Sequence, residues 1–143
     1  MDKTIQTLCL IHQPPNILLG MKKRGFGVGF WNGFGGKVND ESIEEAAKRE
    51  TFEETTLTIV EFEKVGILDF IFKDGKKIQV HFFRVDKYIG QEQETEEMKP
   101  QWFNIKDIPY NNMWSDDTYW MPLFLEGKKF TGEIYFNEND DVE

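Results

Sequence analysis

The chain has 143 residues, and its 17 Lys and Arg against 26 Asp and Glu give a formal net charge of −9. Proteins that bind nucleic acid through its phosphates need a surplus of Lys and Arg, so this balance argues against a nucleic-acid polymer as partner. Nine of the 26 acids lie in residues 40–63 and four in residues 92–97. Because half of the negative charge is local, we expect it to serve a specific site.

The other counts describe an ordinary globular chain. Hydrophobic residues make up 39% of it, enough for a real core, and the length predicts a single domain over residues 1–143. No apolar run approaches the ~18 residues of a membrane helix. The first four residues, Met-Asp-Lys-Thr, do not begin the charged and then apolar pattern of a secretory signal. The one cysteine, Cys9, cannot form an internal disulfide, which is typical of a reducing compartment. We therefore expect a cytoplasmic monomer with no membrane partner.

Two strands, a glycine-rich loop and a helix are predicted in the first part of the chain. Residues 7–12 and 17–21 are apolar and are separated by Gln-Pro-Pro-Asn, which predicts a hairpin. Residues 25–36 hold six glycines interleaved with aromatic residues, a pattern typical of loops in which backbones approach closely. The stretch Ser42-Ile43-Glu44-Glu45 has the form of a capping box and predicts the start of a helix.

The second part of the chain predicts mainly strands. Residues 58–87 are rich in β-branched and aromatic side chains, with a turn at 73–76, so they predict a second hairpin. A strand, a second helix and a last strand follow, over residues 101–105, 115–125 and 129–136. Residues 137–143 are expected to form a frayed tail. The mixture of strands and helices in one compact chain predicts an α+β fold.

The predicted first helix has an unusual face. On a helical wheel, the stripe that starts with Ile43 and two alanines continues with Glu50 and Glu54, and Glu53 lies nearby. One interpretation is a solvated acidic face. The other is a cation site, because carboxylates on an inward face repel one another unless a cation lies among them. Hard divalent ions such as Mg²⁺ or Mn²⁺ bind carboxylate oxygens and also bridge to substrate phosphates.

The acids of this helix resemble a known motif. Glu41, followed after seven residues by R-E-T-F-E-E-T-T-L from Arg49, is similar to the box of the Nudix hydrolases, G-x5-E-x7-R-E-U-x-E-E-x-G-U, where U is bulky and apolar. The five-residue spacing counts from Gly35, whereas Gly36 is the box glycine if the loop after it is one residue shorter than the pattern, which is the interpretation that we prefer. Thr51 stands at a U position, and Thr56 replaces the last glycine. Since that glycine suits a helix C-cap, the departure concerns the helix end and not the acids.

The resemblance extends from about Thr4 to Phe136. The stretches W-N-G-F-G-G-K from Trp31 and M-W-S-D-D from Met113 are similar to those of the Nudix group that hydrolyses oxidised purine nucleoside triphosphates. This resemblance implies an α/β/α sandwich, with a mixed β-sheet between two main helices. It also implies release of a nucleoside monophosphate and pyrophosphate from nucleotides such as 8-oxo-dGTP and 2-hydroxy-dATP, which would sanitise the nucleotide pool.

The resemblance implies a set of metal ligands and catalytic residues. Carried to the matching positions, the ligands of Mg²⁺ or Mn²⁺ are Gly35, Glu50, Glu53, Glu54 and Glu97. The catalytic residues are Glu53, Glu54, Glu97 and Arg49, of which Arg49 orients a neighbouring glutamate; which carboxylate takes the proton stays open. The other acids of residues 92–97 are expected to form an exposed loop.

The resemblance also implies a substrate site. Gly35, Gly36, Lys37 and Lys22 would lie near the phosphates, although residues 22–24 could equally form a solvated basic turn. Trp114 would stack on the base, among further contacts from Thr7, Phe26, Asn32, Phe34, Phe70, Phe72, Asp116 and Asp117. Without the resemblance, residues 115–117 would be interpreted as a helix cap.

The two adjacent aspartates suggest how an oxidised base is selected. Oxidation at C8 of guanine turns the N7 acceptor into an N–H donor, which a carboxylate can accept. If Asp116 and Asp117 share one proton, the site presents one donor and one acceptor and can accept oxidised guanine and oxidised adenine. Two alternatives stay open: a Nudix pyrophosphatase for other or methylated nucleoside triphosphates, and a catalytically silent nucleotide-binding module.

Overall fold

The computed structural model describes residues 3–25, 27–139 and 141–142. Its strands are β1 Lys3–Gln13, β2 Asn16–Lys22, β3 Trp31–Asn32, β4 Thr58–Ile71, β5 Lys77–Ile89, β6 Met98–Asn104 and β7 Phe130–Tyr135. Its α-helices are α1 Ile43–Thr55 and α2 Asp117–Leu125, and the short 3-10 helices η1 Ile105–Asp107 and η2 Tyr110–Asn112 lie between β6 and α2. The strands form one sheet in the order β3-β2-β1-β5-β4-β7, with β6 paired to β2.

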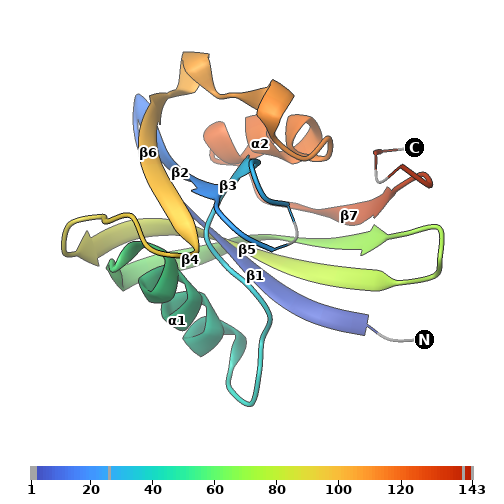
Figure 1. Cartoon of the computed structure of the whole chain (residues 1–143), viewed down its shortest axis with the longest axis horizontal. Coiled ribbons are helices and arrows are strands. Elements are labelled where there is room, and N and C mark those ends of the chain that lie inside the picture. Colours follow the sequence, from blue (N-terminus) through green and yellow to red (C-terminus); the bar gives the residue numbers. More distant parts are fainter. Residues whose placement is uncertain (1–2, 26, 140, 143) are drawn as a thin grey trace.

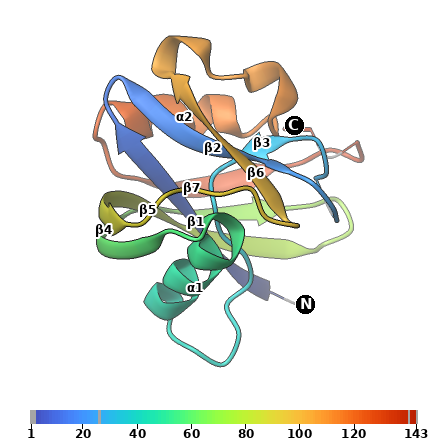
Figure 2. The same cartoon turned by 60° about the vertical axis from the view of Figure 1, so that its left-hand side comes forward.

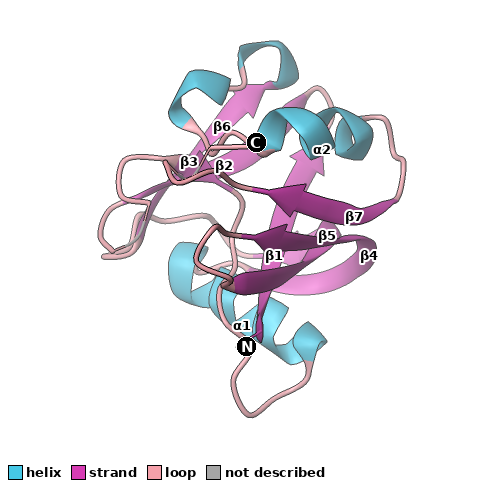
Figure 3. Cartoon of the chain, turned by 90° about the vertical axis from the view of Figure 1, so that its right-hand side faces the viewer, coloured by secondary structure: helices cyan, strands magenta, loops and turns pink. Residues whose placement is uncertain are grey.

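The sheet is mixed and lies between the two helices. Strand β1 runs parallel to β5, and β4 runs parallel to β7, whereas the other pairs are antiparallel. Helix α1 lies on one side of the sheet and α2 on the other (Figures 1 and 3). The predicted sandwich of a mixed sheet and two main helices is confirmed.

Alternation along β1 divides the core into two layers, because successive strand residues point to opposite faces. Cys9 and Ile11 are buried with Ala47 of α1, whereas Leu10 is buried with Trp120 of α2. Cys9 is fully buried, and desolvation raises the pKa of its thiol to about 12. This cysteine is therefore a core residue, as predicted.

The ends of both helices are held by hydrogen bonds. The capping box of α1 is present: the Glu45 N–H donates to Ser42 Oγ at 3.0 Å, and the Ser42 N–H donates to Glu45 Oε1 at 2.9 Å. At the C-terminal end of α2, the guanidinium of Arg84 donates to the Phe124 carbonyl at 2.6 Å and lies 4.6 Å from that residue's ring centroid. These bonds satisfy helix-end groups that have no partner within the helix.

The loop before β6 joins the C-terminal end of α1. The Gln93 N–H donates to the Thr55 carbonyl at 3.0 Å, and Thr95 Oγ1 donates to the Glu54 carbonyl at 3.1 Å. Figure 2 shows the start of β6 beside this end of α1. The acidic loop over residues 92–97 is thereby placed next to the acidic helix.

Two expectations from the sequence differ from the structure. Strand β1 begins at Lys3, earlier than the predicted residue 7, because it pairs with β5 from Lys3 onward. The tail was expected to fray, but the Asn137 N–H donates to the Asp141 carbonyl at 2.7 Å, and the Val142 N–H donates to Ser115 Oγ at 2.9 Å. The early start of β1 and the bond between Val142 and Ser115 come from long-range pairing.

None of the helices in the described part of the chain is long and apolar enough to cross a membrane.

The helix end at Thr56 yields a stability prediction. Thr56 has φ 67° and ψ 9°, a left-handed conformation that costs an L-residue about 1–2 kcal/mol. Its hydroxyl donates to the Gln91 carbonyl at 3.0 Å, a part-exposed bond that contributes about 0.5–1 kcal/mol. We expect Thr56→Gly to raise the melting temperature by about 2–3 °C, since relief of the backbone conformation is the larger effect. Thr56→Ala is the control and should lower it; a lower value for the glycine variant would contradict the prediction.

Candidate functional site

The inward face of α1 carries two partly or fully buried carboxyl groups. Glu54 is only 5% exposed, and burial, followed by the nearby charge of Glu50, raises its pKa to about 8. The pKa of Glu50 is raised too, mainly by desolvation, while the adjacent charge of Arg49 lowers it. The acidic stripe predicted for this helix therefore does turn inward at these two residues. Glu53 instead lies at the rim, with about half of its side chain exposed.

The glycine loop, which contains Gly35 and Gly36, approaches Glu50 and Glu54 closely. The Gly35 N–H donates to Glu54 Oε1 at 3.1 Å, which favours the charged form of that carboxyl. A Cβ at Gly36 would lie 2.6 Å from the Glu50 carboxylate, and one at Gly35 would lie 1.8 Å from the Thr7 carbonyl oxygen. Gly35 accepts no side chain because the backbone of β1 blocks it, whereas a side chain at Gly36 would displace the Glu50 carboxylate.

Arg49 organises the charges at the start of the site. Its guanidinium donates to both carboxylate oxygens of Glu41 at 2.9 Å and to the Lys37 carbonyl at 3.1 Å. It also donates to Glu50 at 3.1 Å and to Glu53 at 3.2 Å. These bonds raise the pKa of Arg49 further above its usual range and lower that of Glu41. Arg49 thus links the loop after Gly36 to two of the predicted metal ligands.

Glu97 is held by a different arginine. Arg24 donates to Glu97 Oε1 through Nη2 at 2.6 Å and through Nε at 3.0 Å, and this bonding lowers the pKa of Glu97. Next to this pair, Lys23 Nζ donates to Glu94 Oε2 at 2.6 Å and to the Thr95 carbonyl at 2.7 Å. Lys23 and Arg24 therefore hold the acidic loop in place.

The predicted ligands do not form a finished metal site. Among the residues that the structure describes, no three His, Cys, Asp or Glu side chains are gathered closely enough to hold an ion. Glu53 and Glu97 are paired with Arg49 and Arg24 instead.

The donor chemistry nevertheless fits a hard divalent cation. Glu50 and Glu54 are half-buried and buried carboxyl groups whose pKa values are raised mainly by desolvation, and the charges of Glu50 and Glu97 raise the pKa of Glu54 further. Lys22 is near enough for its charge to lower the pKa of all three carboxyl groups. A divalent ion with oxygen ligands would favour the charged forms of these carboxyl groups more strongly.

The start of α2 carries a second pair of buried acids. Asp116 is 5% exposed and Asp117 is 2% exposed. Burial raises the pKa of both, and the charge of Asp116 raises that of Asp117 further. Trp120 Nε1 donates to Asp116 Oδ2 at 2.8 Å. Asp117 Oδ2 is buried and has no hydrogen-bond partner within the described residues, so it can receive a polar group from a ligand.

Asp116 stands at the N-cap position of α2, but its side chain does not cap the helix. The backbone of Asp116 is already helical, and its side chain makes no cap hydrogen bond within the described chain. The cap interpretation of residues 115–117 is therefore right about the position and wrong about the side chain, because the Asp116 carboxylate turns to the Trp120 indole instead of the free N–H groups of the helix.

Aromatic side chains lie on the same face of the sheet as α2. Phe136 is buried, stacks on Phe72 at 4.8 Å between ring centroids and meets Phe70 edge-on at 5.6 Å. Trp114 meets Phe30 edge-on at 5.0 Å. These rings supply the flat apolar surfaces that a base requires. Phe26, which is also predicted to contact the base, lies outside the described residues.

The remaining residues predicted to contact the substrate differ in burial and in their hydrogen bonds. Thr7 is buried, and its Oγ1 has no hydrogen-bond partner in the part of the chain that is described. Asn32 Oδ1 accepts from the Gly33 N–H at 2.8 Å. Lys37 is exposed, with its carbonyl bound to Arg49. Phe34 is fully buried in the layer beneath α1 and packs near Gly20, so its side chain belongs to the core, and its contact with substrate stays a prediction.

Sequence reasoning missed two partners of site residues. The bond between Arg24 and Glu97 could have been suspected from the opposite charges of residues 22–24 and 92–97, but no spacing rule relates segments so far apart. The bond between Trp120 and Asp116 carried a clearer signal, since these residues are four apart on a predicted helix and face each other.

Comparison with known proteins agrees with this geometry. The NUDIX domain model matches residues 2–124. The chain is 51% identical over 138 residues to the oxidized purine nucleoside triphosphate hydrolase of Danio rerio, covering 95% of this chain and 88% of that protein. It is 49% identical over 140 residues to the enzyme of the same name from Mus musculus, covering 96% and 90%.

A solved structure supports the same assignment. The fold superposes on the crystal structure of a MutT protein from Bacillus halodurans with a TM-score of 0.83, at 26% identity and with 97% and 94% of the two chains covered. The chain belongs to the NUDIX domain family.

Proposed function

We propose that this protein hydrolyses oxidised purine nucleoside triphosphates to nucleoside monophosphate and pyrophosphate, and so removes damaged precursors from the nucleotide pool. About half of its residues are identical to those of the zebrafish and mouse hydrolases of that name over nearly the whole chain. The structural observation that carries the proposal is the buried pair Asp116 and Asp117, one of which has an unpartnered oxygen. We further propose that it works as a cytoplasmic monomer on free nucleotides.

The phosphates would be bound at the acidic face of α1. Glu50, Glu54, Glu53, Glu97 and the Gly35 carbonyl are the proposed ligands of Mg²⁺, or of Mn²⁺ in its place. When bound, the ion neutralises phosphate charge and lowers the pKa of water. For Glu53 and Glu97 to reach the ion, their carboxylates exchange an arginine partner for it. Lys22, whose charge already acts on these acids, would face the phosphate chain, whereas the exposed Lys37 holds Arg49 through its carbonyl.

Proton transfer would be carried out by the glutamates of the same cluster. A general base needs a carboxylate within hydrogen-bond reach of the attacking water. Glu53, Glu54 and Glu97 are the candidates. Arg49 contacts Glu50 and Glu53 at 3.1 and 3.2 Å, so we assign it to orienting these carboxylates.

Base selection would take place at the start of α2. Burial raises the pKa of both aspartates, and the Trp120 N–H that Asp116 accepts favours the charged form of Asp116, so we assign the shared proton to Asp117, whose Oδ2 has no partner among the described residues. One protonated and one charged aspartate present a donor beside an acceptor. Oxidised guanine, which has gained an N–H at N7, matches this pair, whereas unmodified guanine would meet an acceptor with an acceptor. Trp114, Phe70 and Phe72 would hold the ring, together with Thr7 and Asn32.

A substrate panel tests the function. The wild-type protein with Mg²⁺ is expected to release pyrophosphate from 8-oxo-dGTP and 2-hydroxy-dATP with a kcat/KM at least about tenfold above that for dGTP and dATP. This factor of about ten corresponds to the cost of one mismatched hydrogen bond. Glu53→Gln should lose turnover by a factor of about a hundred or more and keep nucleotide binding, because only the carboxylate charge is removed.

The outcomes of this panel separate the alternatives. Equal rates on normal, oxidised and methylated purines would contradict the substrate assignment but leave a Nudix pyrophosphatase. Binding without turnover by the wild-type protein would favour a nucleotide-binding module.

The raised pKa of Glu54 predicts a pH dependence of stability. Without metal, its folded-state pKa of about 8 lies above the unfolded value of 4.5, so folding favours the protonated form. This contribution is complete below pH 4.5 and is lost as the pH rises to about 8. In EDTA we expect the melting temperature of the wild-type protein to fall over this range relative to Glu54→Gln.

The glutamine variant also controls for the two histidines. The pKa values of His12 and His81 are lowered, so their contribution increases with pH in both proteins and cancels in the difference. Mg²⁺ at pH 8 should raise the melting temperature of the wild-type protein more than that of Glu54→Gln. Parallel curves for the two proteins would contradict the assignment of Glu54.

The shared proton of the aspartate pair makes a further prediction. Asp116→Asn and Asp117→Asn each fix one amide where a carboxyl could change its protonation. We expect each variant to have a lower kcat/KM, and the loss to differ between 8-oxo-dGTP and 2-hydroxy-dATP. The loss should be about tenfold or more on the nucleotide whose hydrogen-bond donors and acceptors no longer match those of the variant. Equal activity of both variants on both nucleotides would contradict the shared proton.

A further inference from the structure

The residues proposed to recognise the base come from two separate parts of the fold. Phe70 and Phe72 lie at the end of β4 and just beyond it. Trp114, Asp116 and Asp117 lie at the start of α2 and in the turn before it. A base that is read by the aspartates and held by the phenylalanines requires a fixed distance between these two walls.

The C-terminal tail connects the two walls directly. Phe136 is buried against Phe70 and Phe72, so the tail leaves the first wall at that residue. The chain then turns back, with Asn137 Oδ1 accepting from the N–H groups of Asn139 and Asp141 at 2.8 and 3.1 Å. The same turn brings Val142 into a β-bridge with Phe136.

The tail reaches the second wall at Ser115. The Val142 N–H donates to Ser115 Oγ at 2.9 Å, across 27 positions of the sequence. Ser115 stands between Trp114 and Asp116, and its carbonyl accepts from Thr118 Oγ1 at 3.1 Å. The hydroxyl of Ser115 therefore joins the aspartate segment to the chain end that covers the phenylalanine wall.

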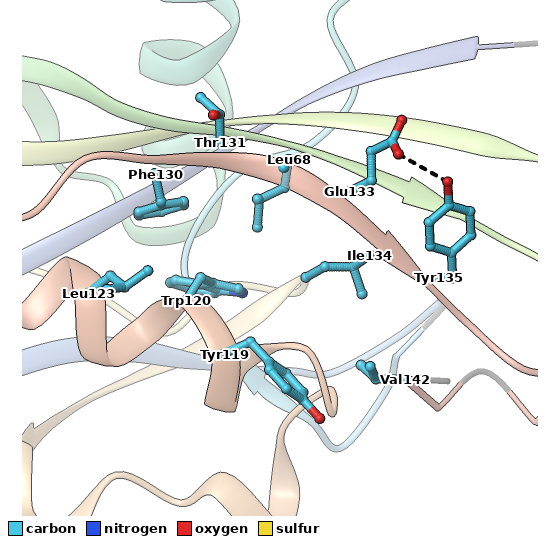
Figure 4. Close-up of a pocket in the computed structure, with 11 residues that line it drawn as sticks. Leu68, Tyr119, Trp120, Leu123, Phe130, Thr131, Glu133, Ile134, Tyr135 and Val142 are labelled. Atoms are coloured by element: carbon cyan, nitrogen blue, oxygen red, sulfur yellow. Dashed lines mark hydrogen bonds between the residues drawn. The ribbon is translucent and has the colours of Figure 1, made fainter.

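Apolar contact supports this hydrogen bond. A hollow of about 380 Å³ lies between α2 and β7, and Val142 lines it together with Tyr119 and Ile134. Figure 4 shows the Val142 side chain beside those of Tyr119 and Ile134. The tail is thus seated by its side chain as well as by its backbone.

We propose that Ser115 is a positioning residue for base recognition. By accepting the Val142 N–H, it fixes the Trp114–Asp117 segment relative to Phe70 and Phe72, and so sets the fit of the oxidised base. The inference rests on the proposed function for its substrate, but the coupling between Ser115 and the tail is a property of the fold alone. The phosphate site on α1 lies across the sheet and is not part of this connection.

The test removes each partner of the hydrogen bond in the full-length protein. Ser115→Ala removes the acceptor, and Val142→Pro removes the donor. Each is expected to raise KM for 8-oxo-dGTP about fivefold, the factor that corresponds to one neutral hydrogen bond, with kcat within about twofold of wild type. The double variant should be no worse than either single variant, because both changes break the same bond.

Two variants serve as controls. Ser115→Thr keeps an acceptor hydroxyl and should restore KM. Tyr135→Phe removes a hydroxyl that donates to Glu133 Oε1 at 3.0 Å near the tail, and should leave KM unchanged. An unchanged KM in Ser115→Ala, additive effects in the double variant, or equal losses for dGTP and 8-oxo-dGTP would overturn the proposal.

Hydrogen exchange separates this proposal from the proposed function. The Asp117 N–H donates to the Trp114 carbonyl at 3.1 Å, and its exchange in the nucleotide-free protein should be faster in Ser115→Ala and Val142→Pro but not in Tyr135→Phe. A wild-type protein without activity on oxidised purines would refute the proposed function and leave this measurement interpretable. Unchanged exchange in an active enzyme would refute the positioning role alone.

Discussion

The close contact between the glycine loop and strand β1 is the constraint on which the site depends. The backbones of Phe34 and Cys9 exchange hydrogen bonds of 2.6 and 2.9 Å, and the Thr7 N–H donates to the Gly36 carbonyl at 2.9 Å. This contact leaves no space for a Cβ at Gly35. Since the same loop presents the Gly35 N–H to Glu54, the position of the buried acid follows from backbone pairing and not from the helix alone.

Two arginines pair with acids of the two acidic stretches, although the chain as a whole keeps a net charge of −9. Arg49 contacts three glutamates of the first acidic stretch, and Arg24 holds two of the second. Exposed ion pairs of this kind contribute little to stability. Their consequence is geometric, because they hold Glu53 and Glu97 near Glu54 while leaving both carboxylates free to exchange partners. A buried partner in place of either arginine would make that exchange costly.

The sequence predicted what local rules determine. The capping box at Ser42, the hairpin turns and the inward acids of α1 follow from spacing, and all are present. The order of the strands, the early start of β1 and the folded tail depend on pairing between distant segments, for which spacing contains no signal. The same limit applies to Phe34: its place in a conspicuous motif suggested substrate contact, but its burial depends on α1 packing above it.

The two groups of residues proposed to form the site begin in opposite layers of the sandwich. Glu50 and Glu54 belong to α1, whereas Asp116 and Asp117 begin α2, with the sheet between the two helices. A substitution in the base-reading layer can therefore change which nucleotide fits without moving the carboxylates of the other layer. In the proposed function, the residues at the start of α2 would select the base and the glutamates of α1 would bind the metal and the phosphates, so the choice of base and the chemistry of hydrolysis would depend on different helices.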